Sequence, residues 1–206
     1  AFHQPHAVMI DSASLDTLPA REFYAGMAEV VKYGALCDRE FHDWLRVNAA
    51  LITARNEQAI DYLIERSVLN KAQIVGQDEK ESGIRALLNL GHSFGHALES
   101  ETAYARFLHG EAVAIGMVTA AKLSEDRGIC ERGTADSLAA LLKKFDLPVL
   151  IPDDLSVDRL AEALKLDKKA VASGLRLVLL KGIGEAVVDQ DSTAEQILNA
   201  IKDSRG

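Results

Sequence analysis

The chain has 206 residues, of which 48% are hydrophobic and 26% charged, and its formal net charge is −8. This composition is ordinary for a globular protein with a buried core, and the length allows one or two domains. The acidic balance argues against binding to nucleic acid, which requires a basic surface, and no apolar run reaches the roughly 18 residues of a membrane span. Two cysteines without a CxxC motif, Cys37 and Cys130, favour a reducing compartment, so we expect a cytoplasmic protein.

The N-terminal stretch contains a short apolar run, Ala7–Ile10, that is typical of a buried strand. No strand partner for it follows nearby, and the chain opens without an initiator methionine. We therefore expect a fragment of a longer chain, in which this strand joins a sheet formed by preceding residues.

Periodicity and capping residues predict a series of helices after this strand. We expect helices at about 19–36, 38–48, 56–75, 85–99, 112–127, 133–145 and 157–166. The apolar runs in 175–188 flank a turn at Gly182 and Gly184 and predict one β-hairpin. Ser192 to Glu195 form a capping box for a last helix that ends near Ile201. The predicted fold class is mainly α, with one short hairpin and the leftover N-terminal strand.

The segment from Arg85 to Glu99 has the most unusual pattern in the chain. If it is one helix, steps of 4, 3, 4 and 3 place its polar residues on a single stripe: Arg85, Asn89, His92, His96 and Glu99. Gly91 and Gly95 each weaken a helix by roughly 1 kcal/mol relative to alanine, so we expect them to allow close approach of a neighbour or a ligand. A lone buried histidine satisfied by a carbonyl would be unremarkable, but two histidines in line with Asn and Arg favour a functional site.

Two other helices carry charged residues in apolar surroundings. Glu29 and Lys32 form either a surface ion pair or a buried carboxylate that needs a cation nearby. Lys71 stands where a hydrophobic residue is expected, so it either extends to the surface or enters a polar cleft. Glu81 is of interest because its charged loop directly precedes the histidine segment.

These residues predict a metal site and an anionic substrate. A catalytic zinc usually takes three His or carboxylate ligands, and spacing alone would select both His92 and His96, with Glu29 and His109 as further candidates. The HExxH pattern of zinc proteases is absent. Fixed cations in an acidic chain suggest a substrate with a carboxylate or phosphate; they are Lys32, Lys71, Arg85, Lys168 and Lys169.

Three segments, 25–34, 88–99 and 108–117, closely resemble the 3-dehydroquinate synthase family, as do 1–5 and 167–169. The matching segments follow in the family's order along the whole chain. The resemblance implies that residues 15–206 are the family's helical metal- and substrate-binding domain. Residues 1–14 would then be the last strand and linker of a nucleotide-binding domain that lies upstream.

The resemblance also implies a role for each candidate residue. The ligands of Zn²⁺ (or Co²⁺) fall at Glu29, His92 and His109, which overrules the spacing-based choice of His96. His96 instead faces the substrate as an acid/base or phosphate-contacting group, and Glu99 remains a helix-end acid. Glu81 matches a further acid or base, and Lys71 and Arg85 match residues that bind the substrate carboxylate. Further substrate contacts fall to Asn89, Lys32 and one of Lys168 or Lys169. The loop that reaches NAD is Ser14, Leu15, Asp16 and Thr17.

The implied reaction converts 3-deoxy-D-arabino-heptulosonate 7-phosphate into 3-dehydroquinate and phosphate, in the shikimate pathway to aromatic amino acids. In it, NAD oxidises a hydroxyl and later returns the hydride, phosphate is eliminated by carbon–oxygen lyase chemistry, and zinc acts as a Lewis acid. The full enzyme is expected to be a homodimer, and this chain alone is expected to be inactive. The alternatives are a sibling sugar-phosphate cyclase, a metal-dependent polyol dehydrogenase and a non-catalytic helical domain.

Overall fold

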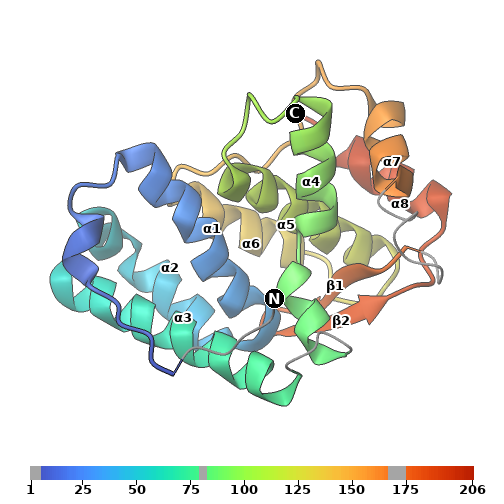
Figure 1. Ribbon diagram of the computed structural model, residues 1–206. Helices are drawn as coiled ribbons and strands as arrows, with labels where there is room; N and C mark the ends of the chain where they lie inside the picture. The colour runs from blue at the N-terminus through green and yellow to red at the C-terminus, as the bar shows by residue number, and fades with distance from the viewer. Residues whose placement is uncertain (1–5, 79–82, 167–174) are drawn as a thin grey trace.

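The computed structural model describes residues 6–78, 83–166 and 175–206 and is mainly helical, as expected (Figure 1). The candidates Glu81, Lys168 and Lys169 lie outside these ranges. The α-helices are α1 (Ala20–Cys37), α2 (Arg39–Thr53), α3 (Glu57–Gln77), α4 (His92–Glu101), α5 (His109–Asp126), α6 (Thr134–Lys143), α7 (Val157–Leu166) and α8 (Ala194–Asp203). Two short 3₁₀ helices, η1 (Ser12–Leu15) and η2 (Ile84–Asn89), precede α1 and α4.

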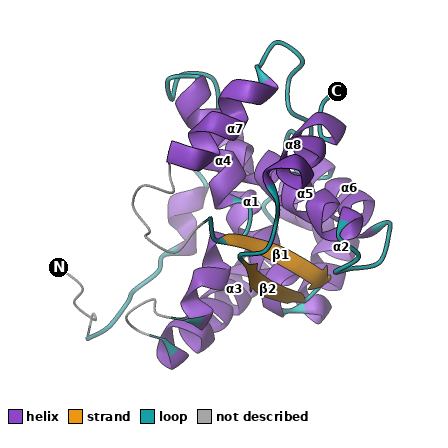
Figure 2. Ribbon diagram, turned by 90° about the vertical axis from the view of Figure 1, so that its right-hand side faces the viewer, coloured by secondary structure: helices purple, strands orange, loops and turns teal. Residues whose placement is uncertain are grey.

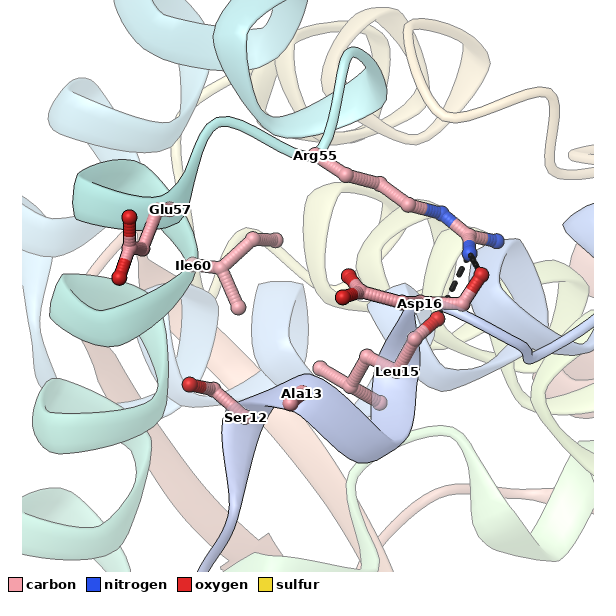
Figure 3. A pocket seen from close by; sticks show the side chains of 7 residues that line it. All are labelled: Ser12, Ala13, Leu15, Asp16, Arg55, Glu57 and Ile60. Atoms are coloured by element: carbon pink, nitrogen blue, oxygen red, sulfur yellow. Dashed lines mark hydrogen bonds between the residues drawn. The ribbon is translucent and has the colours of Figure 1, made fainter.

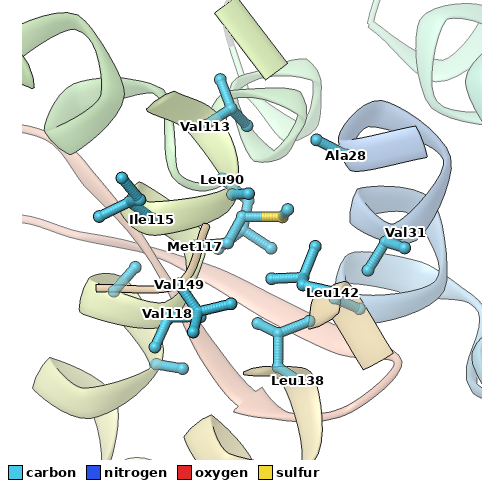
Figure 4. Packing of buried hydrophobic residues seen from close by; sticks show 14 of the residues in the cluster. Ala28, Val31, Leu90, Val113, Ile115, Met117, Val118, Leu138, Leu142 and Val149 are labelled. Atoms are coloured by element: carbon cyan, nitrogen blue, oxygen red, sulfur yellow. The ribbon is translucent and has the colours of Figure 1, made fainter. Parts of the chain in front are cut away.

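Helix α5 is the central element of the fold. All residues from Ala112 to Ala121 are buried, because α1, α4, α6, α8 and the hairpin surround the helix. Its small and β-branched side chains let these neighbours approach closely. Figure 4 shows Val113, Ile115 and Met117 of α5 packed with residues of α1 and α6. The metal-site candidates therefore lie on helices that share one hydrophobic core.

The predicted hairpin is present as β1 (Leu177–Gly182) and β2 (Glu185–Asp189), drawn in orange in Figure 2. The strands are antiparallel, with Leu177 opposite Asp189 and Leu180 opposite Ala186, and Gly184 turns between them at φ +89°. The last helix begins one residue later than expected. Its capping box pairs Thr193 with Gln196, because the Thr193 hydroxyl accepts the Gln196 N–H and the Gln196 side chain accepts the Thr193 N–H.

The strand expected at Ala7–Ile10 does not form. Its side chains are exposed, with Met9 at 96%, and the segment runs outside the helical body in Figure 2. A strand requires hydrogen-bonded neighbours, and the described part of the chain offers none to this segment.

Within the described ranges, no helix is both long and apolar enough to cross a membrane.

Candidate metal and substrate site

The segment Arg85–Glu99 is not one helix, which corrects the expectation of a continuous stripe. It is divided at Gly91, whose left-handed φ of +80° separates η2 from α4. A Cβ at Gly91 would lie 2.6 Å from the Met117 side chain and 2.8 Å from the Val113 carbonyl oxygen. Glycine is thus required for the turn and for the close contact with α5. The expected use of Gly91 in the approach of a neighbour is confirmed.

Three histidine rings meet where the start of α4 lies against the start of α5. The ring centroids are 5.7 Å apart for His92 and His96, 5.2 Å for His92 and His109, and 5.9 Å for His96 and His109. Helix α1 adds Glu29, whose Oε1 lies 3.6 Å from His92 Nε2. Helical spacing could relate only His92 to His96; tertiary packing adds the other two residues.

Two sets of side chains in this cluster have the arrangement of a metal site. In Glu29, His92 and His109, one ligand atom from each residue lies within 4.8 Å of the others. The same holds for His96, Glu99 and His109. The first is the set implied by the family resemblance, and the two share His109.

Glu29 distinguishes the first set. Its Oε2 accepts a 2.6 Å hydrogen bond from Lys32 Nζ, whereas its Oε1 is buried without any hydrogen-bond partner. A buried acceptor without a partner costs about 1–3 kcal/mol, so this oxygen suits a cation. The pair is half-buried: Lys32 is 3% exposed, whereas the Glu29 side chain is 38% exposed. Burial lowers the pKa of Lys32 against the opposing effect of the Glu29 carboxylate.

His92 is held as a neutral imidazole with one nitrogen available. Its Nδ1 lies 3.2 Å from the Leu90 carbonyl oxygen, which can accept the Nδ1–H, while Nε2 faces Glu29. Burial, aided by the charge of Lys32, lowers the pKa of His92 to about 4. A metal ligand must be unprotonated, so this histidine is prepared to bind a metal at neutral pH.

His109 is positioned by contacts that the sequence interpretation missed. Arg21 binds Glu111 through two hydrogen bonds of 2.6 and 2.7 Å, and the Glu111 carboxylate also accepts the Leu108 N–H. These bonds hold the first turn of α5. A Cβ at Gly110 would collide with the Ala25 carbonyl oxygen, so glycine allows α5 to lie directly against α1. No local sequence pattern connects Arg21 with Glu111, 90 positions away.

Glu99 is more than the helix-end acid that the sequence predicts. It is 8% exposed, and its Oε1 lies 3.2 Å from His109 Nδ1. In the sequence, the position of Glu99 one helical turn after His96 is the feature that could have indicated this contact.

The other substrate candidates lie on η2 and α3, which pack against each other and against α1. Arg85 and Asn89 are on η2, where the Asp78 carboxylate accepts the N–H groups of Gly83 and Arg85. Lys71 is exposed on α3, and its charge contributes to the lowered pKa of Lys32. Lys71 therefore lies near enough to act electrostatically on the Glu29–Lys32 pair.

The loop expected to reach NAD lies at a separate cavity of about 370 Å³ (Figure 3). Arg55 donates hydrogen bonds to the carbonyls of Leu15, Asp16 and Leu18, at 2.6 to 2.8 Å. Leu15 and Asp16 line this cavity with Arg55, and no histidine of the metal cluster does. Ser14 belongs to η1, and Thr17 follows in the turn before α1.

Residues 26–170 match the family model of the 3-dehydroquinate synthase C-terminal domain. The chain belongs to the 3-dehydroquinate synthase family. The 3-dehydroquinate synthase of Teredinibacter turnerae is 48% identical over 203 residues, which cover 98% of this chain and 56% of that protein. A 3-dehydroquinate synthase of Pseudomonas fluorescens is 48% identical over 195 residues, covering 95% and 53%. The chain thus spans about half the length of the curated relatives it matches.

Two solved structures have the same fold as this chain. The 2-epi-5-epi-valiolone synthase of Streptomyces hygroscopicus, with NAD⁺ and Zn²⁺ bound, superimposes with a TM-score of 0.85 at 30% identity, covering 94% of this chain and 54% of that one. A 2-deoxy-scyllo-inosose synthase, complexed with carbaglucose-6-phosphate, NAD⁺ and Co²⁺, has a TM-score of 0.74 at 22% identity and the same coverage. At that identity, the second likeness concerns the fold alone.

Proposed function

We propose that this chain is the metal- and substrate-binding part of a 3-dehydroquinate synthase, which converts 3-deoxy-D-arabino-heptulosonate 7-phosphate to 3-dehydroquinate and phosphate. The observation that carries the proposal is the cluster of Glu29, His92 and His109 with a buried, unpartnered Glu29 Oε1. Two relatives named 3-dehydroquinate synthase, each 48% identical to this chain, support the choice of reaction. We further propose a cytoplasmic, homodimeric enzyme of the shikimate pathway.

In this proposal, Glu29, His92 and His109 hold Zn²⁺ or Co²⁺. When bound, the metal supplies Lewis-acid chemistry, which lowers the pKa of a coordinated hydroxyl. The donor set fits, because two imidazoles and one carboxylate with a place for substrate are typical of catalytic zinc. Lys32 neutralises the second oxygen of Glu29 and fixes the orientation of that carboxylate.

Other side chains bind the substrate and move protons. His96 is exposed beside the other two histidines, so it is available to contact the phosphate or to transfer a proton. Lys71 and Arg85 supply positive charge for the substrate carboxylate, with Asn89 as a neutral hydrogen-bonding group. Glu81 and one of Lys168 or Lys169 complete the proposed set. The redox chemistry belongs to NAD, held by an upstream domain and approached by Ser14–Thr17.

A sibling sugar-phosphate cyclase is the second candidate, because the valiolone synthase shares the fold at 30% identity. The test is an assay of the longer enzyme that contains this chain, supplied with NAD and Zn²⁺. We expect phosphate and dehydroquinate to be released from the heptulosonate phosphate. We expect no turnover of sedoheptulose 7-phosphate, which lacks the carboxylate. The opposite preference would favour the sibling activity.

A second experiment tests whether Arg85 binds the substrate carboxylate through its positive charge. Replacing Arg85 with Gln should raise KM for the carboxylate-bearing substrate, because a charge-assisted hydrogen bond is worth about 1.5–3 kcal/mol. An unchanged KM would remove Arg85 from the proposed substrate site.

A further inference from the structure

We infer that Glu99 is a positioning residue of the metal site, which holds His109 through Nδ1 so that Nε2 is directed to the metal. The inference rests on the proposed function, because it assigns a role toward a metal bound by Glu29, His92 and His109.

Burial and contact distinguish Glu99 from an ordinary surface acid. Glu99 is 8% exposed and lies beside Leu98, which is buried in the core. A carboxylate at such a position requires a hydrogen-bond partner or a cation. Its Oε1 lies 3.2 Å from His109 Nδ1, and no other hydrogen bond to this side chain is found among the described residues. Glu99 is therefore directed to His109.

Each of the two histidines in the proposed ligand set has an oxygen acceptor at its Nδ1. The Leu90 carbonyl oxygen lies 3.2 Å from His92 Nδ1, and the Glu99 carboxylate lies 3.2 Å from His109 Nδ1. An acceptor at Nδ1 keeps the proton on that nitrogen and leaves the Nε2 lone pair free. Hydrogen bonds of this kind orient histidine ligands and make them more basic. Both rings thereby present Nε2 as the ligand atom.

Charge gives the two histidines different supports. His92 is 16% exposed at its side chain and is held by a neutral carbonyl, whereas the His109 side chain is 48% exposed and is held by a carboxylate. An exposed imidazole at the start of a helix has few packing contacts to fix its ring. The carboxylate of Glu99 replaces those contacts, since a charged acceptor forms a stronger hydrogen bond than a neutral one.

A competing role for Glu99 is direct ligation, with His96 and His109 as the other ligands. The unpartnered Glu29 Oε1 argues against it, because a metal at the second set would leave this buried oxygen unsatisfied. In the positioning role, each carboxylate has a partner: the metal for Glu29 and His109 for Glu99.

The experiment compares Zn²⁺ affinity, by chelator competition, for the chain and its Glu99→Ala and Glu99→Gln variants. We expect about 100-fold weaker binding for the alanine variant and about 10-fold for glutamine, which keeps an acceptor but not the charge. Glu101→Gln is the matched control, because Glu101 lies on the same helix but pairs with Arg159 at 3.3 Å. We expect this control to bind Zn²⁺ like the wild type.

A second measurement reports which nitrogen of the His109 ring carries the proton. In ¹⁵N-labelled chain, the histidine spectra should show the Nδ1–H tautomer of His109 in the wild type and in Glu101→Gln. Glu99→Ala should give a mixture of tautomers without metal. A purely structural role of Glu99 would lower the melting temperature of the metal-free chain and leave both the tautomer and the Zn²⁺ affinity unchanged.

The possible outcomes separate this inference from the proposed function. Wild-type affinity in both Glu99 variants, or in Glu99→Gln if the alanine variant does not fold, overturns the inference alone. Loss of binding in Glu99→Ala with full binding in Glu29→Ala would identify Glu99 as a ligand and overturn it as well. Failure of the wild-type chain to bind Zn²⁺ would contradict the proposed metal site itself.

Discussion

Glu29 shows how a single side chain can be prepared for a cation. One carboxylate oxygen is engaged by Lys32, which fixes the orientation of the group, and the other is buried without a partner. An unsatisfied buried acceptor destabilises the fold by about 1–3 kcal/mol. A bound cation removes this penalty, so metal affinity and stability of the fold are linked.

Substitution of single ligands should separate the two candidate metal sets. We expect Glu29→Ala and His109→Ala to abolish Zn²⁺ binding, because each removes one of three ligands. His96→Ala should retain it, since His96 belongs only to the second set. Metal analysis of the three purified variants after dialysis checks this. Equal loss in all three would restore the pairing of His92 with His96 that helical spacing suggests.

His42 should make stability depend on pH away from the metal site. It is 2% exposed, neither ring nitrogen has a hydrogen-bond partner, and burial lowers its pKa below the usual value of about 6.5. Asp43 opposes this shift, while Arg46 and Arg39 add to it. The stability contribution is therefore complete above about pH 6.5 and is lost as pH falls toward the folded-state pKa.

His42 is expected to contribute up to about 1.4 kcal/mol per pH unit to the slope between pH 6.5 and 5, because its unfolded form binds a proton that its folded form does not. His92, whose pKa is lowered to about 4, adds to the slope in the same range. Urea unfolding of the metal-free chain across this range measures the slope. His42→Asn should reduce the slope relative to the wild type. Parallel pH profiles for both proteins would show that His42 does not titrate differently in the two states.

At the scale of secondary-structure elements, glycines decide how closely helices carrying the site can meet. Gly91 interrupts the histidine segment and contacts α5, and Gly110 lies against the backbone of α1. The Arg21–Glu111 pair then holds the first turn of α5, where His109 lies. The spacing between helices is thus set by backbone contacts that permit no side chain.

Gly110→Ala should push α5 away from α1 and separate His109 from Glu29. We expect destabilisation of about 1–3 kcal/mol or more, as for other overpacked core positions, together with weaker Zn²⁺ binding. Gly26→Ala on α1 is the control, because a Cβ there meets nothing within 4 Å. It should stabilise the chain by about 0.5–1 kcal/mol through helix propensity. Thermal melts and Zn²⁺ titration of both variants test this, and normal Zn²⁺ affinity in Gly110→Ala would contradict the packing argument.

At the scale of the whole molecule, we propose that the chain carries one half of a larger catalytic unit. It spans 56% and 53% of two curated relatives, and its metal cluster lies entirely within α1, α4 and α5. These helices pack in one core, so the described part of this chain supplies all three proposed metal ligands. The proposed NAD site requires a further domain.

We therefore expect the 206-residue chain to bind Zn²⁺ with near-stoichiometric occupancy and to form no dehydroquinate when supplied with NAD and substrate. Adding the upstream domain should restore turnover. Metal analysis checks Zn²⁺ binding, and a phosphate-release assay checks turnover, for the isolated chain and for the protein with the upstream domain. Turnover by the isolated chain would contradict the division of roles between the domains.

Helical periodicity, turn residues and caps are local properties of the chain, so they predicted most of the helices, the hairpin and the residue types of the site. The family resemblance singled out Glu29, His92 and His109 rather than the HxxxH pair, and this remains a proposal. Three features are visible only in the folded chain: the break at Gly91, the contact of Glu99 with His109 and the support of α5 by Arg21. Each depends on packing between elements, such as the 90-residue separation of Arg21 and Glu111, which no local pattern encodes. The apolar run Ala7–Ile10 shows the same limit, because strand formation depends on a partner elsewhere.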